Sequence, residues 1–211
     1  MDKYLAEFIG TFFLCFAVCV AAALGAAGTD AAYAIAFTLM AMIYAGGPIS
    51  KAHFNPAVTL GFILRGKIDR RDIAPYLIAQ FAAGILASLL ALFVFKQERE
   101  IELVILSGGD ILPALVAEIL FSFALVWVIL HVATYSPTAG NQWFGLAIAA
   151  TVLGGALTVG TYSLAVFNPA VAAALVLVGK LCLTCIWIPV MGSLLGGAGA
   201  ALTFKFMHPK E

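Results

Sequence analysis

The sequence contains the pentapeptide Phe54-Asn55-Pro56-Ala57-Val58 and repeats it as Phe167-Asn168-Pro169-Ala170-Val171. In each copy an Asn stands directly before a Pro, and an apolar run of about helical length follows. Asn is a preferred N-cap residue and Pro fits the first helical turn, so each copy predicts a helix that begins at its Pro. One Asn-Pro pair is a weak signal, because it also marks ordinary turns. Two identical copies indicate a channel in which two short helices meet end to end.

The composition predicts a membrane protein. Of the 211 residues, 64% are hydrophobic and only 10% are charged. A soluble domain of this size could not bury so much apolar side-chain material, so lipid must be the solvent for most of it. Eleven basic and eleven acidic residues cancel. The chain therefore offers no polycationic surface, and this argues against binding of nucleic acid.

The lengths of the apolar runs predict an all-α membrane protein with six crossings and two half-crossings. A helix needs roughly 20 apolar residues to span the hydrocarbon core. Two further runs are too short, because nine residues reach only about 14 Å. Non-helical backbone cannot face lipid, so the segments that lead into the short helices must be enclosed by the long ones. The six spans are expected at about 5–27, 31–50, 72–95, 111–133, 143–163 and 183–206, and the two half-membrane helices at 56–64 and 169–178.

The charged loops predict the orientation in a cell membrane. With a cytoplasmic N-terminus, three basic residues lie outside, at Lys96, Arg99 and Lys180. The cytoplasmic loops carry an excess of Lys and Arg in most membrane proteins, so this topology is favoured, with both termini inside. The eight basic residues then on the cytoplasmic side are Lys3, Lys51, Arg65, Lys67, Arg70, Arg71, Lys205 and Lys210.

The two halves form an internal repeat. Ala6-Glu7 opens the first half and Ala117-Glu118 the second, and 48 and 50 residues separate these glutamates from Asn55 and Asn168. Each half holds three spans and one short helix. Because three is odd, the second half enters the membrane upside down, which gives an inverted-topology repeat with its working site near the midplane. We expect one channel domain over residues 1–211, with repeats at about 1–95 and 111–208.

The meeting point of the short helices has a predictable chemistry. Each helix N-terminus carries roughly half a positive charge, so two of them facing one point repel a cation or hydronium. Ala57 and Ala170 are small enough to allow close contact there. We expect Asn55 and Asn168 to have side-chain N–H groups free to donate to a passing oxygen. A water held by two donors can only donate onward, which disfavours a continuous proton wire.

The chain resembles the aquaporin (major intrinsic protein) family over essentially its full length. The resemblance rests on His53-Phe54-Asn55-Pro56-Ala57-Val58, Phe167-Asn168-Pro169-Ala170, the paired Ala-Glu openings, Ala79-Gln80, and Trp187-Ile188-Pro189-Val190-Met191-Gly192. It implies a bundle of six spans and two half-helices, a pore in every subunit, and a homotetramer. It also implies that Glu7 and Glu118 accept backbone N–H groups of the re-entrant loops. His53 resembles the family's histidine near the inner vestibule.

The chain departs from the family at the selectivity filter. The family commonly has an arginine three residues after the second Asn, where this sequence has Val171. By analogy the other three filter positions are Ile35, Ala156 and Ala165, and a slip of one residue would place Gly155 in the ring instead of Ala156. Replacing a guanidinium by an isopropyl group removes five donors and a permanent charge. This apolar, roomy ring predicts passage of neutral solutes larger than water, such as glycerol, urea-like molecules and metalloid hydroxides.

Other functions remain open at this stage. A mainly water-conducting pore is one alternative, and an ion channel is another, because the filter lacks its arginine. A secondary transporter can also use inverted repeats and broken helices. The spans offer no nucleophile–base spacing, so we expect no enzyme and no cofactor. Cys182-x-x-Cys185 could bind a metal, but the general burial habit of Cys favours small buried thiols, which we also expect at Cys15 and Cys19.

Overall fold

The computed structural model describes residues 1–96 and 100–211, so Arg99 and its predicted outer placement lie outside the described residues. The described chain is almost entirely helical. Its eight longer helices are α1 (Asp2–Ala17), α2 (Ala31–Ser50), α3 (Pro56–Arg65), α4 (Arg70–Leu90), α5 (Ile111–Ala133), α6 (Phe144–Ser163), α7 (Pro169–Val178) and α8 (Trp187–Met207).

Six of these helices can cross a membrane. Judged by length and apolar composition, the described residues contain six candidate spans, and α3 and α7 are the shorter apolar helices. The spans lie where the sequence predicts them, to within a few residues at each end. The sequence gives no sign that two spans end in π-helical turns, at Val18–Ala23 after α1 and at Ala91–Phe95 after α4.

The half-helices α3 and α7 have the same kinds of N-cap and C-cap. The side chain of Asn55 accepts a hydrogen bond from the N–H of Ala57, and Pro56 occupies the first turn of α3. Asn168 caps α7 in the same way. Each helix ends at a glycine with a left-handed φ, 75° at Gly66 and 88° at Gly179. Ten residues at 1.5 Å each give about 15 Å, half the thickness of the hydrocarbon core.

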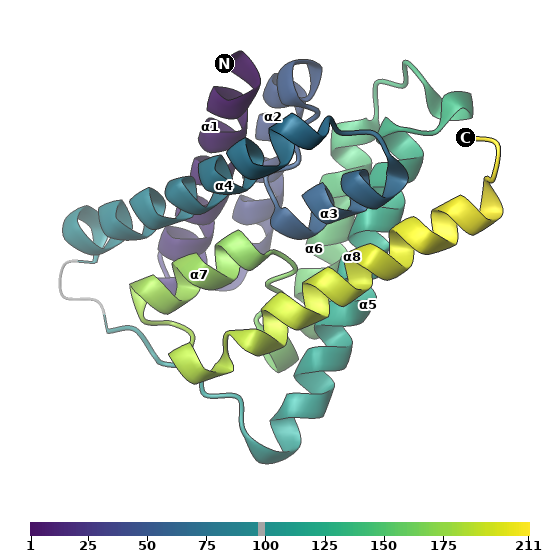
Figure 1. Ribbon diagram of the computed structural model, residues 1–211. Helices are drawn as coiled ribbons and strands as arrows, with labels where there is room; N and C mark the ends of the chain where they lie inside the picture. Colours follow the sequence, from purple (N-terminus) through teal and green to yellow (C-terminus); the bar gives the residue numbers. More distant parts are fainter. Residues whose placement is uncertain (97–99) are drawn as a thin grey trace.

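The long helices surround the two short ones (Figure 1). In the first half α1 packs against α2 and α4, and in the second half α5 packs against α6 and α8. The short helices cross between the halves, because α3 packs against α8 and α7 packs against α4. This exchange ties the two repeats into one bundle and brings the N-termini of α3 and α7 together at its centre.

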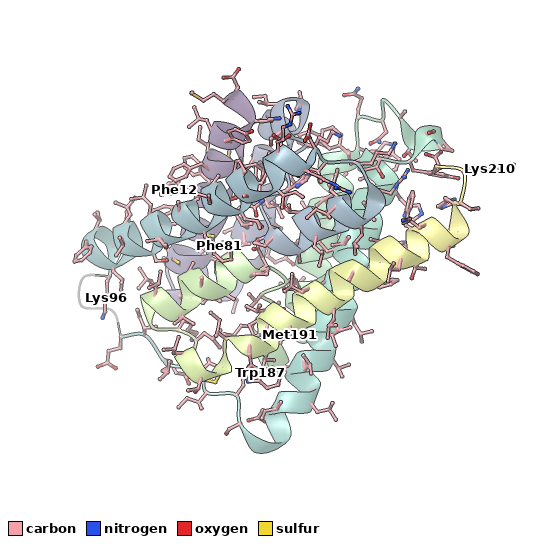
Figure 2. The ribbon with its side chains drawn as sticks, viewed as in Figure 1. Phe12, Phe81, Lys96, Trp187, Met191 and Lys210 are labelled. Carbon is pink, nitrogen blue, oxygen red and sulfur yellow. A yellow bond between two sulfur atoms is a disulfide. The ribbon has the colours of Figure 1, made fainter. Side chains whose placement is uncertain are left out.

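The outer surface of the bundle is apolar. Phe81, Trp187 and Met191 are 38%, 46% and 45% exposed, and Figure 2 shows Phe81 apart from Trp187 and Met191, which lie close together at the start of α8. Buried polar side chains gather instead inside the bundle, around Glu7 and Glu118. This distribution, apolar outside and polar within, suits a protein whose long helices face lipid.

The cysteines divide into two kinds. Cys15 and Cys19 are free and fully buried, as expected. The expectation of free thiols at Cys182 and Cys185 is wrong, because these two residues form a disulfide. The bond also removes the alternative of a metal site there, since both sulfurs are used. A single 3-10 turn at Leu183–Cys185 brings the two residues together, and the apolar composition around them does not reveal this.

The contact between α5 and α8 supports one prediction on stability. A Cβ on Gly196 would collide with the carbonyl oxygen of Ile119 and lie 2.7 Å from the backbone N of Phe123. Backbone atoms cannot give way as a flexible side chain does, so we expect Gly196→Ala to cost about 3 kcal/mol and to lower the melting temperature in detergent. Gly199→Ala is the matched control in the same helix, because its Cβ would meet the ring of Phe123 at an ordinary contact distance, with Cδ2 at 3.5 Å. Equal melting temperatures for the two variants would contradict this packing.

Candidate pore

The loop that leads into α3 is held by one buried carboxylate. Glu7 Oε1 accepts the backbone N–H of His53 at 2.9 Å, and Oε2 accepts that of Phe54 at 2.8 Å. The hydroxyl of Ser50 and the amide of Gln80 donate to the same carboxylate at 2.7 and 2.9 Å. Four donors thus converge on Glu7, which is 0% exposed. The first helix fixes the backbone just before the first Asn.

Glu118 holds the second loop in the same manner. It accepts the backbone N–H groups of Val166 at 2.8 Å and Phe167 at 2.7 Å, and the hydroxyl of Ser163 at 2.8 Å. It is also 0% exposed. The two glutamates therefore make corresponding contacts 111 residues apart in the chain, as an internal repeat requires.

The two loops share an unusual backbone conformation. Three non-glycine residues in each loop have a left-handed φ, at closely matching values of 49–68°, and they are Lys51, Ala52, Phe54, Leu164, Ala165 and Phe167. Such residues cost about 1–3 kcal/mol each and persist only where their surroundings hold them. The hydrogen bonds to Glu7 and Glu118 supply that support.

This conformation turns carbonyl groups away from the glutamates. In a trans peptide the C=O points opposite to the next N–H. Because the N–H groups of His53 and Phe54 point to Glu7, the carbonyl oxygens of Ala52 and His53 point away from it, and both residues line the central cavity described below. The same reasoning places the oxygens of Ala165 and Val166 opposite to Glu118. Each loop thus offers two backbone acceptors on the side of the cavity.

The two loops are joined to each other by the asparagines. Asn55 Nδ2 donates to the carbonyl oxygen of Phe167 at 2.8 Å, and Asn168 Nδ2 donates to that of Phe54 at 2.9 Å. Each side-chain amide has two N–H hydrogens. The expectation that these hydrogens are free is wrong for one hydrogen of each amide, which bonds to the opposite loop. The opposite half takes one hydrogen, and the second is left for a permeant. This reciprocal pair of bonds also fixes the direction of both amides.

The remaining motif residues form the junction itself. Pro56, Ala57, Pro169 and Ala170 are buried in the first turns of α3 and α7. A Cβ on Gly84 would lie 3.1 Å from the oxygen of Ala170, and one on Gly197 would lie 2.9 Å from that of Ala57. A glycine on a long helix therefore allows the first turn of each short helix to approach closely.

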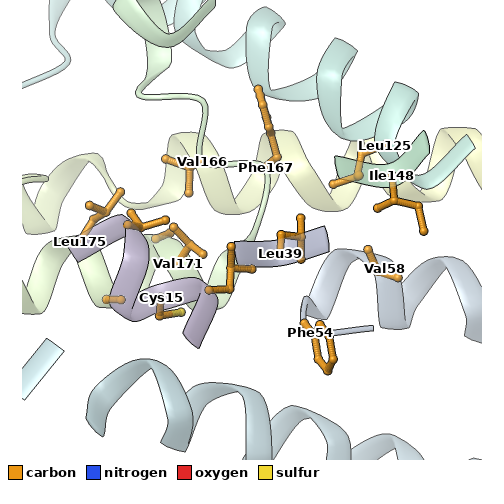
Figure 3. Packing of buried hydrophobic residues seen from close by; sticks show 14 of the residues in the cluster. Cys15, Leu39, Phe54, Val58, Leu125, Ile148, Val166, Phe167, Val171 and Leu175 are labelled. Atoms are coloured by element: carbon orange, nitrogen blue, oxygen red, sulfur yellow. The ribbon is translucent and has the colours of Figure 1, made fainter. Parts of the chain in front are cut away.

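A central cavity of about 120 Å³ passes this junction. Asn55 and Asn168 both line it, and most of its wall is aliphatic. Figure 3 shows part of that wall, with Leu175 and Val171 at one end of the row, Leu39 between, and Val58 and Ile148 at the other end. One water molecule needs roughly 10–15 Å³ of cavity volume measured in this way, so the cavity has room for several waters.

The four residues assigned to the filter all line this cavity. They come from three helices and a loop, and they are Ile35, Ala156, Ala165 and Val171. Gly155 does not belong to the wall, because its Cα faces Phe121 and Phe167, where a Cβ would lie 2.8 and 2.7 Å from ring carbons. This packing favours Ala156 over Gly155 at the filter position, and Ala156 lines the cavity together with Ile148 and Val152 of the same helix.

His53 lies in the cavity wall in the middle of the first loop. It is 4% exposed, and its Nδ1 lies 3.2 Å from the hydroxyl oxygen of Thr59. Its ring packs on that of Phe62 with the centroids 4.0 Å apart. Within the described ranges, no three His, Cys, Asp or Glu side chains are grouped as metal ligands.

Sequence reasoning missed several supporting residues. Ser50 and Ser163 occupy the same place in the two halves, four residues before Phe54 and Phe167. The repeat is therefore longer than the pentapeptide, since it also includes a Ser and an Ala before the Phe, and this longer match would have revealed both serines. Gln80 is part of the family resemblance, but its hydrogen bond to Glu7 has no such signal in the repeat. Its role depends on α4 packing against α1, which the sequence does not specify.

Comparisons with known proteins agree with this geometry. The family model described as "Major intrinsic protein" matches residues 1–204. The chain is 36% identical to aquaporin NIP1-4 of Oryza sativa subsp. japonica, over 99% of this chain and 77% of the relative. It is 37% identical to aquaporin NIP1-1 of Zea mays, over 99% and 75%. The aquaglyceroporin structure from Plasmodium falciparum superposes with a TM-score of 0.76 at 20% identity, covering 98% of both chains, and so shares the fold. This multi-pass membrane protein belongs to the major intrinsic protein family.

Proposed function

We propose that the protein is a passive channel for water and small uncharged solutes of the glycerol, urea and metalloid-hydroxide class. The observation that carries this proposal is the position of Val171 in the cavity wall, beside the small side chains of Ala156 and Ala165. The curated relatives are named aquaporins, which supports water as one permeant. Because the filter residues are small and apolar, solutes larger than water have room to pass.

The polar groups of the cavity suit hydroxyl and amide solutes. Asn55 and Asn168 offer donors at the centre, and the carbonyl oxygens of the two loops offer acceptors on either side of it. A neutral polyol or urea can exchange its water hydrogen bonds for these. An inorganic cation cannot, because the N-termini of α3 and α7 face it with partial positive charge and no carboxylate lines the described cavity.

The wider setting follows from the same proposal. Residues 1–211 form one channel domain, with repeats at about 1–95 and 111–208, and each subunit has its own pore in a homotetramer. The protein lies in the cell membrane with both termini in the cytoplasm, as the distribution of Lys and Arg favours. Figure 2 shows Lys96 and Lys210, which this topology assigns to opposite faces, at opposite sides of the molecule.

The test is solute flux in vesicles that contain the purified protein. Light scattering after an osmotic step reports shrinkage as water leaves and recovery as solute enters. We expect fast shrinkage and fast recovery with glycerol or urea, compared with protein-free vesicles of the same lipid. Fast shrinkage without recovery would reduce the proposal to a water channel. A recovery that saturates at low solute concentration and depends on an ion gradient would replace it by a secondary transporter.

A further inference from the structure

One charged side chain belongs to the cavity wall without any role so far. Lys180 is the only Lys, Arg, Asp or Glu among the lining residues, within residues 1–96 and 100–211. It follows Gly179, where α7 ends. Since α7 starts at the central junction and is about 15 Å long, Lys180 lies at the cavity end farthest from Asn168 along α7. This end is the mouth on the α7 side.

The backbone of Lys180 is held firmly at this mouth. Its N–H donates to the oxygen of Leu175 at 2.9 Å, and its carbonyl accepts the N–H of Val104 at 2.8 Å. Val104 in turn accepts the N–H of Cys182 at 3.1 Å. The loop before α5 is therefore paired with the chain at Leu181, directly after Lys180.

A second group of contacts holds the same turn. Cys182 and Cys185 are joined by the disulfide, and the N–H of Leu106 donates to the sulfur of Cys185 at 3.3 Å. Backbone pairing on one side and the disulfide on the other leave the main chain of residue 180 little freedom. A charge carried on such a backbone stays at the mouth.

Lys180 has no ion-pair partner within residues 1–96 and 100–211. In the described part of the chain, the ion pairs are Lys3–Asp72 and Arg65–Glu211, and neither involves Lys180. The nearby filter contributes no charge, since its residues are Ile35, Ala156, Ala165 and Val171. A positive charge at a narrow, mostly apolar mouth raises the local potential, because low-dielectric walls focus its field.

We propose that Lys180 is the specificity-determining charge of this mouth, where it repels cations and favours entry of neutral and anionic species. The inference rests on the proposed function, in which the cavity is the path of the solute. Lys180 thus provides, at the rim, a fixed positive charge that the ring residue Val171 does not provide. Its long side chain leaves the ring itself wide enough for uncharged solutes.

The local potential can be measured with a reporter thiol inside the mouth. Ala156→Cys places a small thiol on the cavity wall, while the native Cys15 and Cys19 are 0% exposed and the other two cysteines form a disulfide. Two methanethiosulfonate reagents of similar size, one with a sulfonate and one with a trimethylammonium group, are applied from the α7 side at low salt. Mass spectrometry gives the modification rate of each. The ratio of the anionic to the cationic rate reports the potential.

We expect Lys180→Met, in the Ala156→Cys background, to lower this ratio roughly fivefold, as removal of one unit charge several Å away implies. Lys180→Glu should lower it further, and Lys180→Arg should leave it unchanged. Lys96→Met is the matched control, because Lys96 is an exposed lysine outside the cavity wall. The difference should shrink in 1 M salt, where the Debye length is about 3 Å.

An unchanged ratio in Lys180→Met would overturn the inference, and so would a thiol at 156 that reacts with neither reagent. Glycerol and urea fluxes are measured separately, in vesicles that contain the protein with its native Ala156. They test the proposed function independently of the modification rates. A charge-dependent ratio without solute flux would leave Lys180 with its role and reject the solute channel. Solute flux with an unchanged ratio would support the solute channel and reject the role of Lys180.

Discussion

Val171→Arg is expected to reduce glycerol and urea flux by about tenfold or more, while water flux falls much less. Val171 is 3% exposed, lies in the first turn of α7 and lines the cavity. An arginine there adds a long side chain with five donors and a charge to a ring whose other members are aliphatic. The wall then narrows to a size that passes water and obstructs larger solutes. Light scattering of vesicles with purified protein measures both fluxes.

The controls for this variant separate blockage from misfolding. Val171→Ile keeps the position apolar and should retain most of the glycerol flux. The arginine variant should fold, because its side chain extends into the cavity and its backbone N–H remains available to Asn168 Oδ1 at 3.4 Å. Placing a cation near the N-terminus of α7 costs about 0.3–1 kcal/mol. An arginine variant that folds and passes every uncharged solute at the original rate would remove residue 171 from the filter.

Glu118→Ala is expected to unfold the second re-entrant loop and to leave little folded protein. The substitution removes the acceptor of Val166, Phe167 and Ser163, and three buried donors are left without a partner. Each such group costs about 1–3 kcal/mol, and about 3–9 kcal/mol together is a large part of the stability of a typical protein. The left-handed residues of the loop also lose their support. Thermal unfolding in detergent and the yield of monodisperse protein measure the effect.

Two variants calibrate the loss. Glu118→Gln preserves the shape but replaces one acceptor oxygen by a donor, so we expect an intermediate drop in melting temperature. Glu102→Ala removes an exposed carboxylate in the loop before α5 and should leave the melting temperature unchanged. If Glu118→Ala were as stable as the unsubstituted protein, the loop would be held by something other than this carboxylate.

The helices could be predicted from the sequence because their signals are local. A span needs a continuous apolar run, and a half-helix needs an Asn-Pro start and a short apolar run. The bounds of α3 and α7 agree with the expected ranges for this reason. The family matched over residues 1–204 is also the one that the doubled motif suggested.

Other features could not be predicted, because they depend on contacts between distant segments. Nothing in Lys51, Ala52 or Leu164 marks a left-handed backbone, which arises only when a glutamate from another helix takes the neighbouring N–H groups. The pairing of each Asn amide with the opposite loop likewise needs both halves in place.

The cavity wall could be predicted only in part. Filter positions were assigned by analogy, and for α6 the choice between Gly155 and Ala156 depends on how the helix is rotated about its axis. That rotation follows from the packing of Gly155 against Phe121 and Phe167. The sequence indicates only that Lys180 lies on the outer side, because a lysine after an apolar helix is ordinarily a solvated loop residue. Only the fold brings it to the rim of the cavity.

The most direct measurement is a high-resolution electron cryo-microscopy map of the protein in lipid nanodiscs with glycerol. We expect a continuous file of water or glycerol density from one face to the other, with oxygens about 2.7–3.2 Å from the Nδ2 atoms of Asn55 and Asn168. Amides that lie far apart, or a junction sealed from any continuous passage, would contradict a conduit formed where the two half-helices meet.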